Sequence, residues 1–211
     1  MKSEEEIDLR RELFVSSYHF PKSNVTSKKK ALIAAINASV RTRKYPVYSD
    51  DISGRIEAVY FWKDQLEKLG NKYMLDIQDK NQFLKDVYAL QKSINKSQHA
   101  KCFYDGKIRI GQCQKSLSIY LKWMWCQREL AGTPPVCPID GQVLSKCYKV
   151  LKKQPLIDKE KLGLTHTKWS NLNDKTVYEK LVSITEEVAR LEGESESCVW
   201  ELFAFEEPKR K

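Results

Sequence analysis

The chain has 211 residues, of which 41% are hydrophobic and 31% are charged, and this balance is typical of a globular protein. Its formal net charge of +9 at pH 7 favours an anionic partner, with nucleic acid the first candidate. No apolar run reaches the roughly 18 residues that span a bilayer, and the start MKSEEEIDLRRELF lacks the apolar core of a signal peptide. We therefore expect an intracellular protein, in the cytoplasm or nucleoid, that binds no membrane.

The six cysteines are scattered without a C-x-x-C pair, and the three histidines are isolated from one another. Local spacing of this kind predicts neither a zinc site nor an iron–sulfur cluster, so we expect no metal, no cofactor and reduced, mostly buried thiols. The chain also lacks a P-loop, a G-x-S-x-G elbow, an H-E-x-x-H helix and a dinucleotide fingerprint. ATPase, serine hydrolase and zincin functions are therefore unsupported.

Helical periodicity dominates the first hundred residues. Residues 4–16 form a short charged segment, and KKKALIAAINASVRTRK at 28–44 has an apolar middle with basic ends. We expect Lys28, Lys29 and Lys30 to grip phosphates. The alternative is an amphipathic helix that packs on the core and keeps these amines in water.

A turn region, YPVYSDD, precedes a long helix that we expect to end near Leu69, with Gly70 as its terminator. The next helix is predicted from Asp79 to about Asn95, capped by Asp79 with Gln82 at the capping-box position. Three residues are candidate N-caps of the long helix: Ser49, Asp50 and Asp51.

The second half begins at CFYDGKIRI, whose D-G pair predicts a short hairpin or an irregular corner within 103–110. Helices are then expected at 111–130, 140–153 and 174–192, before an aromatic C-terminal piece. The prediction is an all-α fold of one domain, 1–211, with lobes at 1–100 and 101–211 around a cleft.

The stretch GQCQKSLSIYLKWMWC has too many apolar residues for one helix face. One face is a core stripe of Leu117, Tyr120, Leu121, Met124 and Trp125. The opposite face alternates amines with apolar groups: Lys115, Ile119, Lys122 and Cys126. This alternation is expected where a helix lines a partly dry cleft; the alternative is that both lysines lay their stems along the surface.

In a dry cleft, desolvation disfavours an ammonium ion and frees the amine as a nucleophile toward a carbonyl or an anomeric carbon. A nearby carboxylate can accept the proton and stabilise positive charge on a sugar. Asp140 is the best candidate for this carboxylate, because Pro138 and a tight loop hold it at a helix start. The alternative is that Asp140 is a simple N-cap.

The order of glycine turn, helix with an early lysine, loop and P-x-D corner resembles the helix-hairpin-helix DNA glycosylases that also cleave the strand. KSLSIYLKWM is most similar to the archaeal oxoguanine glycosylase branch, in which a second lysine follows seven residues after the first. The resemblance covers about residues 106–145 and implies Lys115 as nucleophile and Asp140 as its acidic partner. The chain departs from the usual hairpin, because Gly111 stands alone and Lys115 follows it by four residues.

The resemblance further implies a duplex partner that carries a damaged or modified base, bound by a monomer. Amides of Gly111 and Gln112 would meet phosphate at the helix N-terminus, beside the basic side chains of Lys107 and Arg109. Three residues are expected at the base pocket: Ile119, Lys122 and Trp200. Trp62 and Trp169 are other candidate stacking faces, although most tryptophans are expected in the core.

The expected function is thus a DNA glycosylase with AP-lyase chemistry. The alternative is a non-catalytic helical protein that binds nucleic acid or serves in defence and uses Lys115 and Asp140 structurally.

Overall fold

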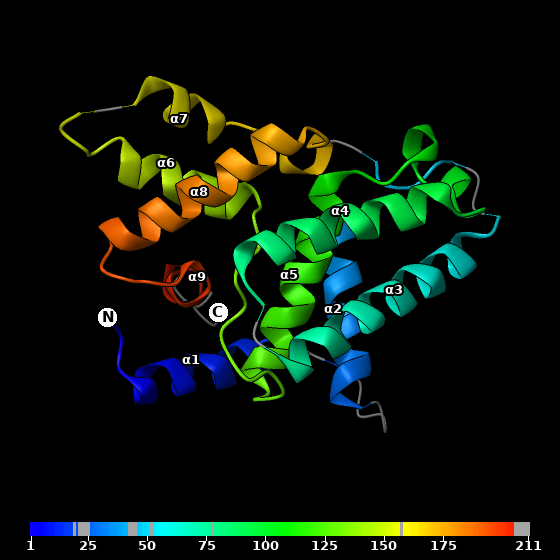
Figure 1. The fold of residues 1–211 in the computed structure, drawn as a ribbon, viewed down its shortest axis with the longest axis horizontal. Coiled ribbons are helices and arrows are strands. Elements are labelled where there is room, and N and C mark those ends of the chain that lie inside the picture. Colours follow the sequence, from blue (N-terminus) through cyan, green and yellow to red (C-terminus); the bar gives the residue numbers. More distant parts are fainter. Residues whose placement is uncertain are drawn as a thin grey trace.

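The computed structural model describes residues 1–18, 20, 26–41, 46–50, 53–76, 78–156 and 158–204. Within these ranges the protein is all-helical, which confirms the predicted fold class (Figure 1). The α-helices are α1 (Glu4–Ser16), α2 (Ser27–Val40), α3 (Arg55–Leu75), α4 (Lys80–Lys96), α5 (Ile110–Cys126), α6 (Gly141–Leu151), α7 (Lys159–Leu164), α8 (Lys175–Leu191) and α9 (Ser197–Ala204). Short 3₁₀ helices are η1 (Ala100–Cys102), η2 (Tyr104–Gly106) and η3 (Trp169–Asn171).

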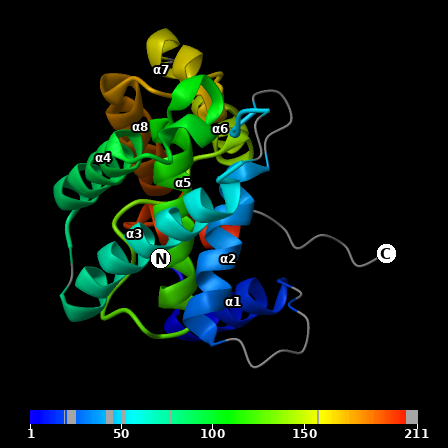
Figure 2. The ribbon, with the colours of Figure 1, turned by 90° about the vertical axis from the view of Figure 1, so that its right-hand side faces the viewer.

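Helix α5 is the centre of the molecule (Figures 1 and 2). It packs against α2, α3 and α4 on one side, and α1 and η3 also contact it, while α6 to α9 pack among themselves. Every residue of α5 is buried, and one hydrophobic cluster extends through both groups of helices. The buried residues include polar and charged ones, among them Gln114, Lys115 and Lys122, so the burial of α5 extends beyond its apolar stripe. The expectation that one whole face of α5 lines a cleft is therefore wrong, and the division into two lobes stays a prediction.

The expected end of the long helix at Gly70 is also wrong, because α3 continues to Leu75. Gly70 is a packing position: a Cβ built there would lie 2.2 Å from Cε1 of the Tyr120 ring. The start of α3 differs too, since its N-cap is Gly54, at φ 74°, and not Ser49 or Asp50. The third candidate cap, Asp51, lies outside the described residues, as do residues 42–44 of the predicted basic helix.

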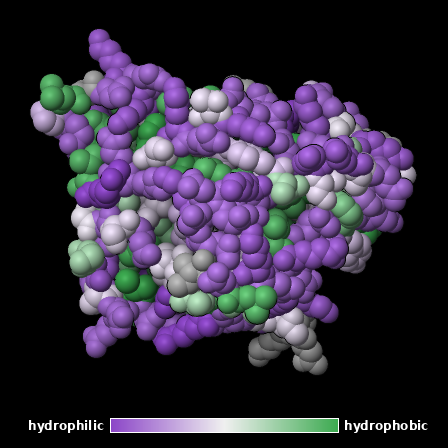
Figure 3. Space-filling view, viewed as in Figure 1, coloured by the Kyte–Doolittle hydropathy of each residue, from purple (hydrophilic) through white to green (hydrophobic). Residues whose placement is uncertain are grey.

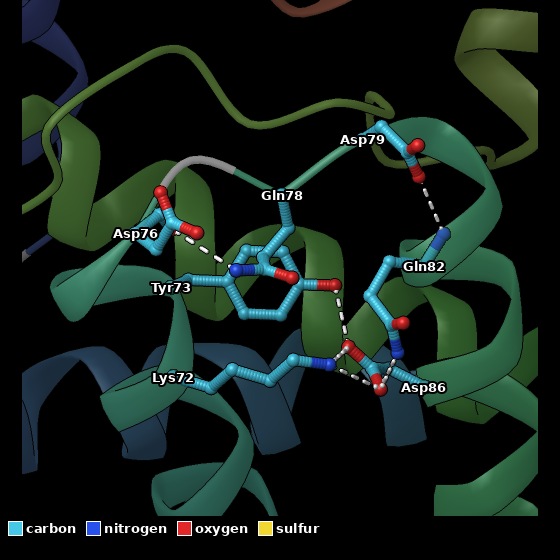
Figure 4. A network of polar contacts seen from close by, with 7 residues as sticks. All are labelled: Lys72, Tyr73, Asp76, Gln78, Asp79, Gln82 and Asp86. Carbon is cyan, nitrogen blue, oxygen red and sulfur yellow. Dashed lines mark hydrogen bonds and ion pairs between the residues drawn. The ribbon is translucent and has the colours of Figure 1, made fainter.

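Helices α3 and α4 are joined by a buried carboxylate (Figure 4). Asp86 accepts hydrogen bonds from Lys72 Nζ at 3.0 Å, Tyr73 Oη at 2.9 Å and Gln82 Nε2 at 2.8 Å. Asp79 caps α4 as predicted, accepting from the Gln82 backbone amide at 2.7 Å. The capping box is incomplete, because the Gln82 side chain turns to Asp86. These polar contacts fix the angle between the two helices.

The D-G corner is a turn without a hairpin. Asp105 and Gly106 have φ values of 55° and 66°, as a tight turn requires, but the chain then runs directly into α5. Residues around the turn form η1 and η2, and the β-pairing found among the described residues is an isolated antiparallel bridge between Tyr48 and Phe103. The turn predicted from the D-G pair is therefore present. Of the two predicted forms, it is the irregular corner and not the hairpin.

All six cysteines are buried and unpaired, as expected for reduced thiols. The face of the molecule in Figure 3 is mostly hydrophilic, with hydrophobic residues in small separated groups. In the described part of the chain, no helix combines the length and the apolar character that crossing a membrane requires.

Candidate active site

Lys115 and Asp140 lie together where α5 meets the start of α6. Lys115 Nζ is 3.0 Å from Asp140 Oδ2. The other oxygen, Oδ1, accepts from the backbone amides of Gln142 at 2.9 Å and Val143 at 3.1 Å. Asp140 is therefore the N-cap of α6 and the partner of Lys115 at once, because its two oxygens point in different directions.

A neighbouring glutamine holds the loop before Asp140 against α5. The buried Gln114 side chain donates to the carbonyl of Ile139 at 2.6 Å and accepts from the Ile139 amide at 3.2 Å. Gln114 and Ile139 each precede one member of the Lys115–Asp140 pair in the sequence. This double hydrogen bond therefore fixes the separation of the amine and the carboxylate.

The third side chain of the site, after Lys115 and Asp140, is Trp169, whose ring centroid lies 4.2 Å from Lys115 Nζ. Its 3₁₀ helix is tied to the first turn of α5: the Gly111 amide donates to the Leu172 carbonyl at 2.9 Å, and Gln112 Nε2 donates to the Ser170 carbonyl at 2.6 Å. Gly111 is required for this approach, since a Cβ there would lie 1.8 Å from the Trp169 carbonyl oxygen. The cation–π contact holds the amine against the indole face.

These three side chains border a pocket of about 640 Å³. Of the described residues that line it, Asp140 is the only acidic one, whereas Arg41, Lys115 and Lys168 are cationic. The remaining wall is mostly polar or aromatic: Gln142, Ser145, Tyr148, Thr165, His166, Thr167 and Ser170. An amine, a carboxylate and an indole thus meet in a pocket whose lining favours an anionic ligand.

The expected phosphate-binding turn is closed by the rest of the fold. Gly111 and Gln112 are buried. The Gly111 amide donates to the Leu172 carbonyl and the Gln112 side chain donates to the Ser170 carbonyl, so the Gly111 amide is not presented to a phosphate. Arg109 is also buried; its guanidinium lies 3.4 Å from Asp105 and 5.4 Å from the Tyr104 ring centroid. Lys107 is exposed and remains available to an anion.

The expected base pocket is not assembled, because Ile119, Lys122 and Trp200 do not line the space beside Lys115. Lys122 lies two turns further along α5, about 10 Å along the helix axis, where it pairs with Glu201 of α9 and lies 4.4 Å from the Phe14 ring centroid.

Burial disfavours the ammonium form of Lys122, but the charge and hydrogen bond of Glu201 outweigh it and raise the pKa of Lys122. Trp200 is buried and donates to Glu192 at 2.7 Å. The other stacking candidate, Trp62, is buried and donates to Ser116 at 3.1 Å. The aromatic face beside the amine is therefore that of Trp169.

The three lysines at the start of α2 have different surroundings. Lys28 Nζ pairs with Glu67 at 3.0 Å and donates to Asn71 at 2.8 Å. Lys29 is exposed, and Lys30 Nζ lies 6.0 Å from the Phe20 ring centroid. Lys28 is therefore engaged with the protein itself, and none of the three lines the pocket.

The pocket residues that sequence reasoning missed include Arg41, Tyr148, His166 and Lys168. The last two lie in THTKWS, a polar and aromatic loop between amphipathic helices, which is the kind of segment that carries binding residues. The composition of that loop was the signal from which His166 and Lys168 could have been predicted. Arg41 belongs to the basic end of the predicted 28–44 helix, but its place at the pocket, like that of Tyr148, depends on the packing of α2 and α6.

Within the described residues, no three His, Cys, Asp or Glu side chains are arranged to hold a metal ion. Comparison of the chain with protein-family models, with curated proteins and with solved structures returned no match. Function is therefore argued from the geometry and chemistry of the pocket.

Proposed function

We propose that the protein is a DNA glycosylase with AP-lyase chemistry, which removes a damaged or modified base from duplex DNA. The observation that supports this most strongly is the 3.0 Å contact between Lys115 Nζ and Asp140 Oδ2 inside a pocket whose other charged side chains are cationic. An amine next to a carboxylate is the pair that nucleophilic displacement at a sugar carbon requires.

In the proposed reaction, a proton moves from Lys115 Nζ to Asp140 Oδ2 along their hydrogen bond. The neutral amine attacks C1′ of the nucleotide. The C1′–N bond to the base breaks, and its electron pair leaves with the base. The nitrogen now bound to C1′ gives one of its two protons to water, and the departing base takes up one proton from water in exchange. The proton on Asp140 passes to the sugar ring oxygen as the ring opens, and loss of the last proton from nitrogen leaves an imine.

Substrate access follows from the position of the amine. Lys115 is nearly buried at the base of the pocket, so a base in a stacked duplex cannot bring its C1′ to Nζ. The nucleotide is flipped out, with the indole of Trp169 as a stacking face and Arg41 and Lys168 as phosphate contacts. We propose that one monomer performs this on intracellular DNA.

The test is covalent trapping. The protein is incubated with borohydride and duplexes that carry a panel of damaged and modified bases, and cross-linking and base release are both measured. We expect a Lys115-dependent cross-link on at least one duplex. Lys115→Gln abolishes the cross-link and base release but leaves duplex affinity nearly intact, because the nucleophile acts mainly in the transition state. Lys68→Gln, on an exposed amine paired with Asp64, is the control and keeps full activity.

The competing function is a non-catalytic helical protein that binds nucleic acid or serves in defence. Duplex binding without base release across the whole panel would decide against the glycosylase, and undiminished base release by Lys115→Gln would decide against Lys115 as its nucleophile.

A further inference from the structure

A second groove, of about 370 Å³, lies between α2 and α3. Val40, the last residue of α2, lines this groove, and the next residue, Arg41, lines the Lys115 pocket. The groove and the pocket are therefore lined by consecutive residues at the C-terminal end of α2.

The α3 side of the groove carries two large hydrophobic side chains that the fold does not bury. Ile56 is 68% exposed and Tyr60 is 67% exposed. They are four residues apart on one helix and so lie on the same face. Single exposed hydrophobic residues are ordinary, but two side by side at a groove indicate a surface that binds a ligand.

Cations accompany the aromatic rings of this groove. The Arg55 guanidinium lies 4.9 Å from the Tyr48 ring centroid, and Lys63 Nζ lies 5.8 Å from the Tyr60 ring centroid. Of the described residues that line the groove, none is acidic. The groove therefore complements a ligand that carries both negative charge and flat apolar groups.

We propose that this groove binds an unpaired stretch of a nucleic-acid strand, with a base stacked on Tyr60 and phosphates paired with Arg55 and Lys63. Exposed aromatic faces beside cations are the combination by which proteins hold single strands without reading their sequence. An acidic peptide would satisfy the cations but leave the Tyr60 ring without a flat partner. The site is separate from the Lys115–Asp140 pair and needs no chemistry there.

The experiment uses the Lys115→Gln protein, so that no reaction intervenes, and measures the anisotropy of a labelled oligothymidylate at low salt. Tyr60→Ser is expected to weaken binding about 10-fold, because stacking on an aromatic side chain contributes that order of affinity. Tyr60→Trp restores binding, and the emission of its added indole is quenched by the bound strand. Leu75→Ser, at an 87% exposed position at the end of the same helix, leaves the Kd unchanged.

Three outcomes would contradict strand binding by the groove. They are full oligothymidylate affinity in Tyr60→Ser, an equal loss of affinity in Leu75→Ser, and Tyr60-dependent binding of an acidic peptide in place of the strand. Thermal unfolding confirms that the Tyr60 variants are folded. The result is separable from the proposed function, because trapping by Lys115 is measured on the unsubstituted protein. If no base is released there, the strand can still bind the groove; if the groove fails, Lys115-dependent trapping is unaffected.

Discussion

At the scale of single residues, the candidate site depends on the two oxygens of Asp140. Oδ1 caps α6, and Oδ2 contacts the amine of Lys115. Asp140 can therefore cap α6 and act as the acidic partner of Lys115 at the same time. Substitutions that keep one oxygen and remove the other separate the two roles.

We predict that Asp140→Asn lowers base release by about 10²-fold or more, because an amide cannot take the proton from Lys115. Asparagine caps a helix about as well as aspartate, so the melting temperature should change little, whereas Asp140→Ala should also lose about 1 kcal/mol of stability. Asp174, the N-cap of α8, is the matched control: Asp174→Ala costs similar stability and leaves base release unchanged. Wild-type base release in Asp140→Asn would remove the carboxylate from the mechanism.

A second residue-scale prediction concerns Gly111. Helix propensity favours alanine over glycine by about 0.5–1 kcal/mol, but a Cβ at Gly111 meets the Trp169 carbonyl oxygen at 1.8 Å. Overpacking of this kind typically costs about 1–3 kcal/mol. Gly111→Ala should therefore lower the stability to urea and displace the Trp169 ring from Lys115. Gly163→Ala, where a Cβ meets nothing within 4 Å, should be neutral or stabilising, and equal behaviour of the two variants would contradict the close approach.

At the scale of elements, α5 holds two lysines on one face in different surroundings. Lys115 reaches the polar pocket, whereas Lys122 is covered by α1 and α9 and pairs with Glu201, with side-chain exposures of 5% and 11%. Removing water from both charges makes the pair sensitive to the loss of either partner. The pair therefore fixes α9 against α5.

We predict that Lys122→Met or Glu201→Leu alone destabilises the protein by about 3–5 kcal/mol, because each leaves an unpaired buried charge. The double variant should recover most of that loss, since no charge remains. Lys68→Met, which breaks the exposed pair with Asp64, should cost less than about 1 kcal/mol. Urea unfolding measures all four proteins, and a double variant no more stable than the single ones would show that the pair is not coupled.

At the scale of the whole molecule, the cations behind the net charge of +9 differ in how available they are to an anionic ligand. Lys28 is engaged by Glu67, and Arg109 lies beside Asp105. Arg41 and Lys168 border the pocket in which the candidate chemistry lies. We therefore expect the pocket rim to contribute more to phosphate binding than the start of α2.

Duplex affinity is predicted to fall log-linearly with salt. Substituting Arg41 and Lys168 together by Gln should flatten the slope by roughly 2, since each phosphate contact contributes about 0.9. The Lys28, Lys29 and Lys30 triple variant should also flatten it, but less per residue, because Lys28 already has an acidic partner. Duplex titrations over a range of salt concentrations compare the variants. An unchanged slope would show that the substituted cations do not contact phosphate.

The sequence by itself determined where most helices begin, and it singled out the candidate pair of the proposed site. Asp79 caps its helix as predicted, Asp140 caps α6 as the alternative interpretation had it, and Asp174, at the expected start of the 174–192 helix, caps α8. A side chain that accepts from an amide two or three residues on is a local interaction. The all-helical class followed from periodicity for the same reason. The order of lysine, loop and P-x-D corner also singled out Lys115 and Asp140 before their distance was known.

Only the tertiary structure decided what surrounds those residues. Gly70 and Gly111 look like helix punctuation in sequence, yet each is a point where another part of the chain, Tyr120 or Trp169, approaches the backbone. Seven residues separate Lys115 from Lys122, and this spacing puts both on one face of α5. Whether a pocket or a carboxylate faces each amine depends on which distant segments pack there, and helical periodicity carries no information about those partners.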